Sequence, residues 1–339
     1  MKVLITGAAG FLGSRLAREL IRRGRLASRA IERLVLTDRA EFAAAPNPLA
    51  RDGRVQMLTG DLLEQVDALA AQRFDGIFHL ASAVSAECEA DFGLGMRANL
   101  DTTRRLLDAC RAEGNVPRIV FSSSLAVFGA DPGLPLPEVV RDDTLPTPQT
   151  SYGMQKFVCE QLLADHTRRG HLDGRAVRLM TVVVRPGRPN AAASGFLSSL
   201  VREPLAGLEA VCPVDPSTPV ALSSATSTID GLITAFETSR EAFGGRTALN
   251  LPALTVTVQQ MLEVLGRIGG DEALSRVRFE IDPTIERMVI GWPARVEAAR
   301  ARRLGLHSEP DFATIVRAYV REHREAVANA RALAAVQEA

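Results

Sequence analysis

The sequence predicts an α/β fold in which a doubly wound parallel sheet carries a smaller α+β lobe. Short apolar runs rich in β-branched residues alternate, in the first half of the chain, with stretches whose apolar residues have helical spacing. The first such run leads through three glycines into a helix, and later runs end in small or polar residues. Because the carboxyl ends of parallel strands share one edge of a sheet, these residues are expected to meet there.

The composition excludes several classes of protein. The chain has 339 residues, 46% of them hydrophobic, which is enough for a large packed core. Its 40 basic and 40 acidic residues create no field that would attract nucleic acid or a membrane surface. No apolar run reaches the roughly 18 residues of a membrane span, and the start resembles no signal peptide. The four cysteines are Cys88, Cys110, Cys159 and Cys212, and they lack metal-ligand spacing. We therefore expect reduced thiols in a cytoplasmic protein and no catalytic metal.

The first 24 residues predict a phosphate cradle. Val3 to Ile5 form a buried strand, and a helix starts at Phe11 and Leu12. Between and within these elements lie Gly7, Gly10 and Gly13. Glycines permit the tight turn and a close backbone approach, and the N–H groups at the start of the helix can bind a pyrophosphate. The pattern therefore predicts a Rossmann-type dinucleotide site, although a glycine triplet alone is a weak signal.

Asp38 strengthens this interpretation and favours NAD. It ends the second apolar run, Arg33 to Thr37, near the spacing expected for a carboxylate that binds the adenosine ribose. A carboxylate accepts hydrogen bonds from the ribose hydroxyls and repels a 2′-phosphate, so NADP is disfavoured. The neighbouring Arg39 could weaken that preference.

The next elements follow the same alternation. We expect strands at 55–59, 76–80, 118–122 and 177–184, and helices at 63–72, 95–112 and 151–170. Asp61 follows the third strand, where its carboxylate could meet the adenine amino group. The small residues Ala81 and Ser82 follow the fourth, where they would allow close passage of a dinucleotide. A proline-rich loop before Tyr152 is expected to form a wall of the active site.

Tyr152 and Lys156 form the chemical centre of the prediction. Their i, i+4 spacing near a helix start puts both side chains on one face. The Lys156 ammonium, with an oxidised nicotinamide nearby, would lower the pKa of Tyr152, which could then remove the proton of a secondary alcohol. Ser124, at the end of the fifth strand, is expected to orient the same oxygen. The chain has only two lysines and two tyrosines, so a chance surface pair is a poor alternative.

We divide the chain into two regions. Residues 1–187 are predicted to form the NAD-binding Rossmann domain with Ser124, Tyr152 and Lys156. Residues 188–339 are predicted to be mainly a substrate-binding lobe with C-terminal helices. The small and polar stretch 189–199 is expected to lie on the substrate side.

The motifs together resemble the extended branch of the short-chain dehydrogenase/reductase superfamily. They are TGAAGFLG (Thr6 to Gly13), Asp61-Leu62, HLAS (His79 to Ser82), SSSLAVFG (Ser122 to Gly129) and YGMQK (Tyr152 to Lys156). The resemblance implies that Asp61 and Leu62 flank adenine, that Leu80, Ala81, Ser82 and Asn99 lie on the cofactor side, and that Thr181 and Val182 lie near the nicotinamide. It also implies a homodimer through helices 95–112 and 151–170.

Within this branch, longer strings resemble the D-erythronate dehydrogenase family, which oxidises the C2 hydroxyl of a four-carbon sugar acid with NAD. They include VVVRPGRPNAAASGF (Val182 to Phe196) and VREPLAG (Val201 to Gly207). The resemblance implies a substrate carboxylate, for which an arginine fork is suited. The candidate substrate-binding residues are Ser124, Tyr152, Arg185, Asn190 and Arg202, although each arginine could equally be a surface residue.

Two other functions remain open from the sequence. A nucleotide-sugar 4-epimerase or dehydratase would use the same three residues with tightly bound NAD, although a dehydratase would favour an acid where Leu125 follows Ser124. A non-catalytic NAD-sensing regulator would not require Tyr152 and Lys156. The sequence leaves open which sugar acid is the substrate, the direction of the reaction, any NADP use and the oligomeric state.

Overall fold

The computed structural model describes residues 1–42, 48–187 and 194–336. Its centre is an all-parallel sheet of seven strands. In spatial order these are β5 (Val55–Thr59), β4 (Arg33–Asp38), β1 (Lys2–Thr6), β6 (Gly76–His79), β7 (Arg118–Ser124), β9 (Asp173–Leu179) and β13 (Leu249–Asn250). From β1 the chain first adds β4 and β5 toward one edge and then β6, β7, β9 and β13 toward the other, as expected for a doubly wound sheet. The predicted fold class is therefore confirmed.

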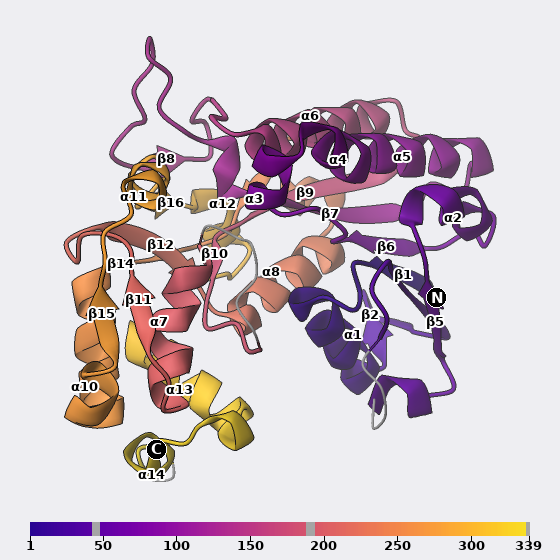
Figure 1. The fold of residues 1–339 in the computed structure, drawn as a ribbon. Coiled ribbons are helices and arrows are strands. Elements are labelled where there is room, and N and C mark those ends of the chain that lie inside the picture. The colour runs from indigo at the N-terminus through magenta and orange to yellow at the C-terminus, as the bar shows by residue number, and fades with distance from the viewer. Residues whose placement is uncertain (43–47, 188–193, 337–339) are drawn as a thin grey trace.

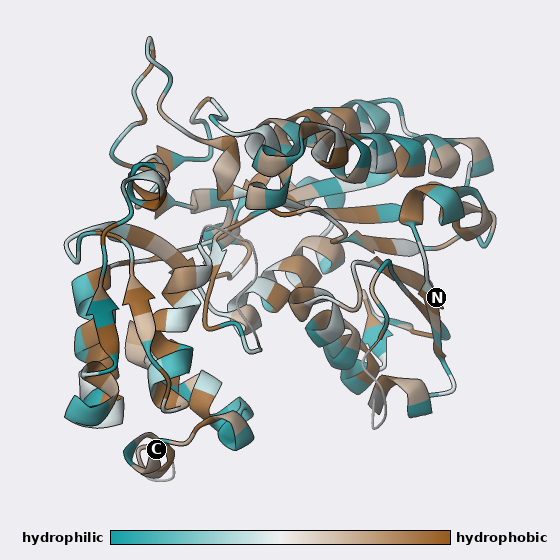
Figure 2. Cartoon of the chain, in the orientation of Figure 1, coloured by the Kyte–Doolittle hydropathy of each residue, from teal (hydrophilic) through white to brown (hydrophobic). Residues whose placement is uncertain are grey.

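Helices cover both faces of this sheet (Figure 1). One face packs against α1 (Phe11–Arg23) and α8 (Ala225–Glu237). The other packs against α2 (Leu62–Ala70), α5 (Thr102–Glu113) and α6 (Ser151–Arg168). Side chains alternate between the two cores, since Val3 and Ile5 enter the first and Leu4 enters the second. Burial on both sides explains the continuous apolar runs of β1, β4 and β6, and Figure 2 shows much of the sheet in brown.

A second region lies beside the carboxyl ends of the strands (Figure 1). It has its own apolar core under a three-stranded sheet, β10-β12-β14, and a two-stranded sheet, β11-β15. Its strands are β10 (Thr181–Val182), β11 (Ala210–Cys212), β12 (Pro219–Ser223), β14 (Leu254–Thr257) and β15 (Val277–Phe279). Its helices are α7 (Gly195–Leu205), α10 (Val258–Leu274), α11 (Pro283–Ile290), α13 (Phe312–Glu322) and α14 (Ala330–Ala334).

The remaining elements are short. They are β2 (Arg25–Leu26), β3 (Arg29–Ala30), β8 (Val140–Arg141), β16 (Val296–Glu297), α3 (Ser85–Ala90), α4 (Phe92–Gly95), α9 (Arg240–Phe243) and α12 (Ala299–Arg303). Within the described ranges, no helix is both long enough and apolar enough to cross a bilayer.

Several predicted elements have different bounds. The helix predicted over 95–112 is a short α4, a π-helix at Met96–Asp101 and then α5. The strand predicted over 177–184 divides after Leu179, and β10 joins the second sheet. The proline-rich loop forms little of the cavity wall, since only its last residue, Thr150, lines it. The division at residue 187 stays a prediction, and α8 and β13 from beyond it pack against or join the large sheet.

Candidate active site

The glycine loop is tightly packed. Gly7 has φ +70°, and a Cβ there would lie 2.7 Å from the backbone nitrogen of Ala81. A Cβ on Gly13 would lie 2.1 Å from the carbonyl oxygen of Gly7. Gly10 precedes α1, and no side chain in the described ranges caps that helix end. The first N–H groups of α1 therefore point at an adjoining cavity, which suits an anion.

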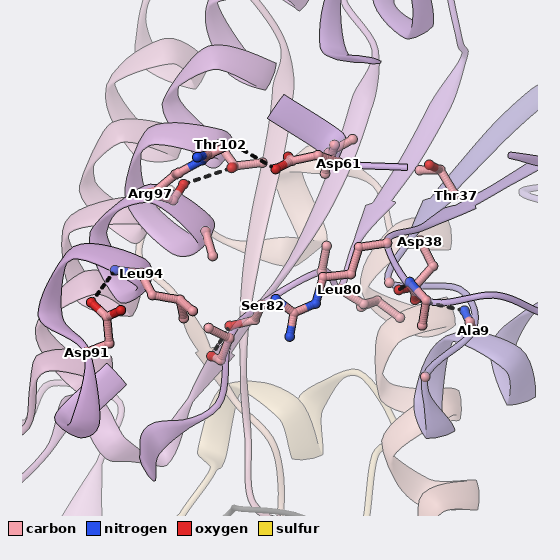
Figure 3. A pocket seen from close by; sticks show the side chains of 18 of the residues that line it. Ala9, Thr37, Asp38, Asp61, Leu80, Ser82, Asp91, Leu94, Arg97 and Thr102 are labelled. Atoms are coloured by element: carbon pink, nitrogen blue, oxygen red, sulfur yellow. Dashed lines mark hydrogen bonds and ion pairs between the residues drawn. The ribbon is translucent and has the colours of Figure 1, made fainter. Parts of the chain in front are cut away.

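Two cavities meet at this loop. The larger, about 840 Å³, is drawn in Figure 3 and runs from the glycines past Asp38 to Arg97. The smaller, about 370 Å³, runs from Gly10 to Tyr152 and Arg185. Both are lined by Gly7, Gly10, Leu80 and Ser82. Together they form one site that extends to both sides of the glycines along the carboxyl ends of the strands.

The larger cavity collects the residues predicted for the adenosine half. Asp38 lies at its edge, where its carboxylate accepts hydrogen bonds from the N–H groups of Ala9 at 2.9 Å and Ala40 at 3.0 Å. Asp61 and Leu62 line the far end, near Arg97 (Figure 3). Asp61 caps α2 through the N–H of Leu63 at 2.9 Å, which fixes its carboxylate.

Arg97 was missed by the sequence analysis. Its Nη2 lies 3.0 Å from Oδ2 of Asp61, and both residues line the cavity. Arg39, which also lines the cavity, is 3.5 Å from Glu87. Neither arginine belongs to a recognisable motif, so only the fold could reveal these two ion pairs.

Asn99 lies behind the wall of the site. It is buried, and its side-chain oxygen accepts hydrogen bonds from Ser82 Oγ at 2.9 Å and from the N–H of Ala83 at 2.8 Å. Its amide nitrogen donates to Gln155 Oε1 at 2.8 Å. Asn99 therefore braces the loop after β6 against α6. Its predicted cofactor contact stays a prediction.

Ser124, Tyr152 and Lys156 come together at one end of the smaller cavity. Tyr152 and Lys156 lie on the first two turns of α6, whose start is capped by Thr150 through the N–H of Gly153 at 3.0 Å. Ser124 ends β7, and its hydroxyl is near enough to Tyr152 to act against the raised pKa of that phenol. The ammonium of Lys156 donates to the carbonyl oxygen of Ser122 at 2.9 Å and lies 5.6 Å from the centroid of the Tyr152 ring.

Burial sets the protonation of this pair. It raises the pKa of Tyr152 to about 12, against hydrogen bonds from Ser124 and Ser82 and the charge of Arg185, which lower it. Burial also lowers the pKa of Lys156 to about 8. At neutral pH the pair is therefore a neutral phenol beside an ammonium. The predicted lowering of the Tyr152 pKa by Lys156 and an oxidised nicotinamide stays a prediction.

The smaller cavity is also lined by Thr181, Val182 and Arg185, three of the residues predicted for the nicotinamide and the substrate. The guanidinium of Arg185 is held by the carbonyl oxygen of Val182 at 3.0 Å and by Ser194 Oγ at 2.9 Å. Arg202 is buried outside the cavity lining, where it pairs with Glu203 and donates to the carbonyl oxygen of Arg185 at 2.6 Å. Asn190 lies outside the described residues.

Met288 and Trp292 also line the smaller cavity, which the sequence did not predict. They lie at and just after the end of α11, more than 100 residues beyond Tyr152. No local pattern announces such a contact, although the only tryptophan of the chain is a weak signal.

The comparisons with known proteins agree with this geometry. Residues 3–220 match the model of the NAD dependent epimerase/dehydratase family. The chain belongs to this family. A D-erythronate dehydrogenase of Cupriavidus necator is 47% identical over 95% of this chain and 98% of its own length. A D-erythronate dehydrogenase of Haemophilus influenzae is 40% identical over 94% and 99%. A nucleoside-diphosphate-sugar epimerase structure from Agrobacterium tumefaciens is 41% identical, with a TM-score of 0.88 over 96% of this chain and 95% of that one.

Membership of this epimerase/dehydratase family makes the protein an NAD-using enzyme that acts on a CH–OH group. The site fits that cofactor. The glycine cradle leaves no room for a Cβ at Gly7 or Gly13, the free helix end can bind the pyrophosphate, and Asp38 can accept hydrogen bonds from the ribose. Bound NAD would be held by these residues and by the small side chains after β6.

Proposed function

We propose that the protein oxidises the C2 hydroxyl of D-erythronate, or of a similar four-carbon sugar acid, to the 2-oxo acid. The observation that carries the proposal is the placement of Arg185 in the same small cavity as Ser124 and Tyr152. The name of the relative that is 47% identical over nearly the whole chain supports the same substrate. A reaction of this kind belongs to sugar-acid catabolism.

Each polar residue has a role in this proposal. Ser124 hydrogen-bonds the C2 oxygen, and Tyr152 as the phenolate takes the hydroxyl proton. Lys156, as an ammonium, favours that phenolate and holds the nicotinamide ribose. As the C–H bond breaks, its electron pair leaves C2 with the hydrogen and the C–O bond becomes a carbonyl. NAD supplies the acceptor for that hydride.

Arg185 would bind the carboxylate of the substrate. Its guanidinium is pre-positioned by Val182 and Ser194, and a planar guanidinium can bind a carboxylate through two parallel hydrogen bonds. The ion pair of Arg202 with Glu203 leaves Arg202 less suited to that role, so we propose that Arg202 supports the backbone of Arg185 instead.

A second candidate is a nucleotide-sugar epimerase, favoured by the name of the structure that is 41% identical. Such an enzyme regenerates NAD in each turnover. The experiment mixes purified protein with NAD and either four-carbon sugar acids or UDP-sugars, and follows NADH absorbance. Net NADH from D-erythronate that is lost in Tyr152→Phe and kept in Tyr319→Phe supports the dehydrogenase. Conversion of a UDP-sugar without net NADH would establish the epimerase instead.

We further propose a cytoplasmic homodimer that pairs residues 95–112 and 151–170 of each copy. In the structure α5 and α6, which include most of these residues, lie side by side on one face of the sheet (Figure 1). Light scattering after size-exclusion chromatography measures the mass in solution. A protein that elutes at 36.5 kDa, the mass of one chain, would rule out the dimer.

A further inference from the structure

A buried ion pair lies beneath the candidate active site. Glu160 of α6 accepts hydrogen bonds from Arg178 of β9, with Nε 2.9 Å from Oε1 and Nη2 2.7 Å from Oε2. Their side chains are only 2% and 6% exposed. Burying two charges carries a desolvation penalty that their mutual attraction repays only in part, and apolar side chains of similar size often stabilise a core as well. Stability alone therefore does not account for the pair.

The pair is tied to the strand that carries Ser124. Ser123, the residue before it, donates its hydroxyl hydrogen bond to Oε1 of Glu160. The carbonyl oxygen of Ser122 accepts the hydrogen bond of Lys156. Three consecutive serines of β7 therefore contact three residues of α6 that are spaced one turn apart, since Ser124 contacts Tyr152. This ladder fixes the helix against the strand at the position of the reacting groups.

Arg178 extends the same network across the sheet. Its guanidinium lies 4.8 Å from the centroid of the Phe128 ring, and its Nη1 is 3.4 Å from Oδ1 of Asn250 in β13. The amide nitrogen of Asn250 donates in turn to the carbonyl oxygen of Arg141 at 3.1 Å. Arg178 is thus held from several sides, and Glu160 has little freedom to move.

We propose that Glu160 and Arg178 are positioning residues, which lock the helix of Tyr152 and Lys156 onto the serine strand and keep Lys156 an ammonium. This inference rests on the proposed function for the catalytic role of Lys156. Glu160 lies one helical turn after Lys156, on the same face of α6. Its carboxylate favours the charged form of the lysine, and Arg178 balances that carboxylate.

The groups that face Lys156 support this assignment. Tyr152 and Cys159 lie on the same helix, Cys88 on α3 and His79 on β6. Burial raises the pKa of both thiols and of Tyr152, and it lowers the pKa of His79 to about 3. These four groups are therefore neutral near pH 7. Burial lowers the pKa of Lys156, and the charges of Cys159, Cys88 and Glu160 oppose it; because the two thiols are neutral near pH 7, Glu160 is the anion that remains.

The test is a direct titration of Lys156. Lys2 and Lys156 are the only lysines of the sequence, so protein grown with ¹³Cε-lysine gives two signals. The exposed Lys2 serves as the internal reference. We expect the pKa of Lys156 to fall by about one unit in Glu160→Gln, because the anion is lost and the Arg178 cation remains. The double variant Glu160→Gln/Arg178→Gln removes both charges and should recover at least half of that shift.

The control variant is Asp165→Asn, which removes an acid from the same helix at an exposed position. Its Lys156 signal should titrate as in the wild type. An equal shift of the Lys156 pKa in Glu160→Gln and Asp165→Asn would overturn the proposal. A double variant whose Lys156 pKa shifts as far as that of Glu160→Gln would overturn it too. If Glu160→Gln fails to fold, Arg178→Gln gives the reverse test, since the unbalanced carboxylate should raise the pKa of Lys156. No rise would contradict the proposal.

The positioning role has a separate readout. Ser123→Ala keeps both charges and removes the link between Glu160 and β7, so kcat should fall several-fold while KM and NAD binding stay unchanged. Equal losses in kcat and NAD binding would indicate a general structural defect and contradict the positioning role. Because the lysine titration needs no substrate, it still decides the charge role if the wild-type protein oxidises no sugar acid.

Discussion

The backbone N–H of Ala9 donates a hydrogen bond to Oδ2 of Asp38, with 2.9 Å between nitrogen and oxygen. The contact joins the glycine loop to the end of β4. A second N–H, from Ala40, binds Oδ1 of the same carboxylate at 3.0 Å. Asp38 is therefore fixed at the edge of the larger cavity as a charged acceptor.

This relationship predicts the cofactor preference. Asp38→Asn keeps one oxygen, which can accept from only one of the two N–H groups, and removes the charge that repels a 2′-phosphate. We expect kcat/KM for NAD to fall about tenfold to a hundredfold, as for a lost hydrogen bond to a charged group, and the ratio of NADP to NAD use to rise. Steady-state kinetics with both cofactors measures this. Asp165→Asn, the same substitution at an exposed position outside both cavities, is the control, and an unchanged ratio in Asp38→Asn would refute the role of the carboxylate.

Gly13→Ala tests the phosphate cradle. The added Cβ would lie 2.1 Å from the carbonyl oxygen of Gly7, so the loop must shift. We expect NAD binding to be lost and the free energy of unfolding to drop by about 1–3 kcal/mol, as for an overpacked site. Calorimetric titration and denaturant unfolding measure the two effects. Gly53→Ala is the matched control, because no atom of the described residues lies within 4 Å of a Cβ built at Gly53.

Arg185→Gln tests recognition of the substrate carboxylate. The variant should raise KM for D-erythronate about tenfold to a hundredfold, because a charge-assisted hydrogen bond to the carboxylate is lost. Arg185→Lys, which keeps the positive charge, should show a smaller rise in KM. The comparison substrate is the amide of the same acid, whose KM should change little between the two proteins. The exposed Arg168→Gln is the control. Equal losses for acid and amide would show that Arg185 acts on something other than the carboxylate.

His79 predicts a step in acid stability. Its ring is buried between Thr6 Oγ1 at 2.7 Å and Thr103 Oγ1 at 2.9 Å, and burial lowers its pKa to about 3. The unfolded chain, with an ordinary histidine pKa of about 6.5, binds the proton first, so stability falls as pH drops from about 6.5 toward 3. Carboxylates such as Asp173, with its pKa lowered to about 2, lose stabilisation only below about pH 4.

Denaturant midpoints of unfolding between pH 7 and 5 separate the histidines from the carboxylates, and since burial also lowers the pKa of His166 and His323, the His79 part is the difference between wild type and His79→Gln. The midpoint of the wild-type protein should decrease from pH 7 to pH 5, and the decrease should be smaller in His79→Gln. His307→Gln changes an exposed histidine and should leave the slope as it is. A wild-type midpoint that is constant from pH 7 to 5 would contradict the assignment.

The sequence was informative where chemistry and local geometry coincide. The strand ends, the glycine cradle, Asp38 and the Tyr152–Lys156 spacing could all be predicted, because each depends on neighbours within a few residues. The break after Leu179 could not, since it depends on which sheet each half of an apolar run joins. Trp292 and Arg97 reach the site only through the packing of distant helices and loops, and no local pattern carries that information.

The last strand of the large sheet has a consequence for synthesis of the chain. β13 arrives only at Leu249–Asn250, after α7, β11, β12 and α8 have been made. While the ribosome is still producing those elements, the apolar face that α8 later covers stays open to water, with Phe78 and Val120 among its side chains. The core of the large sheet therefore cannot be complete until about three quarters of the chain, through Asn250, has emerged from the ribosome.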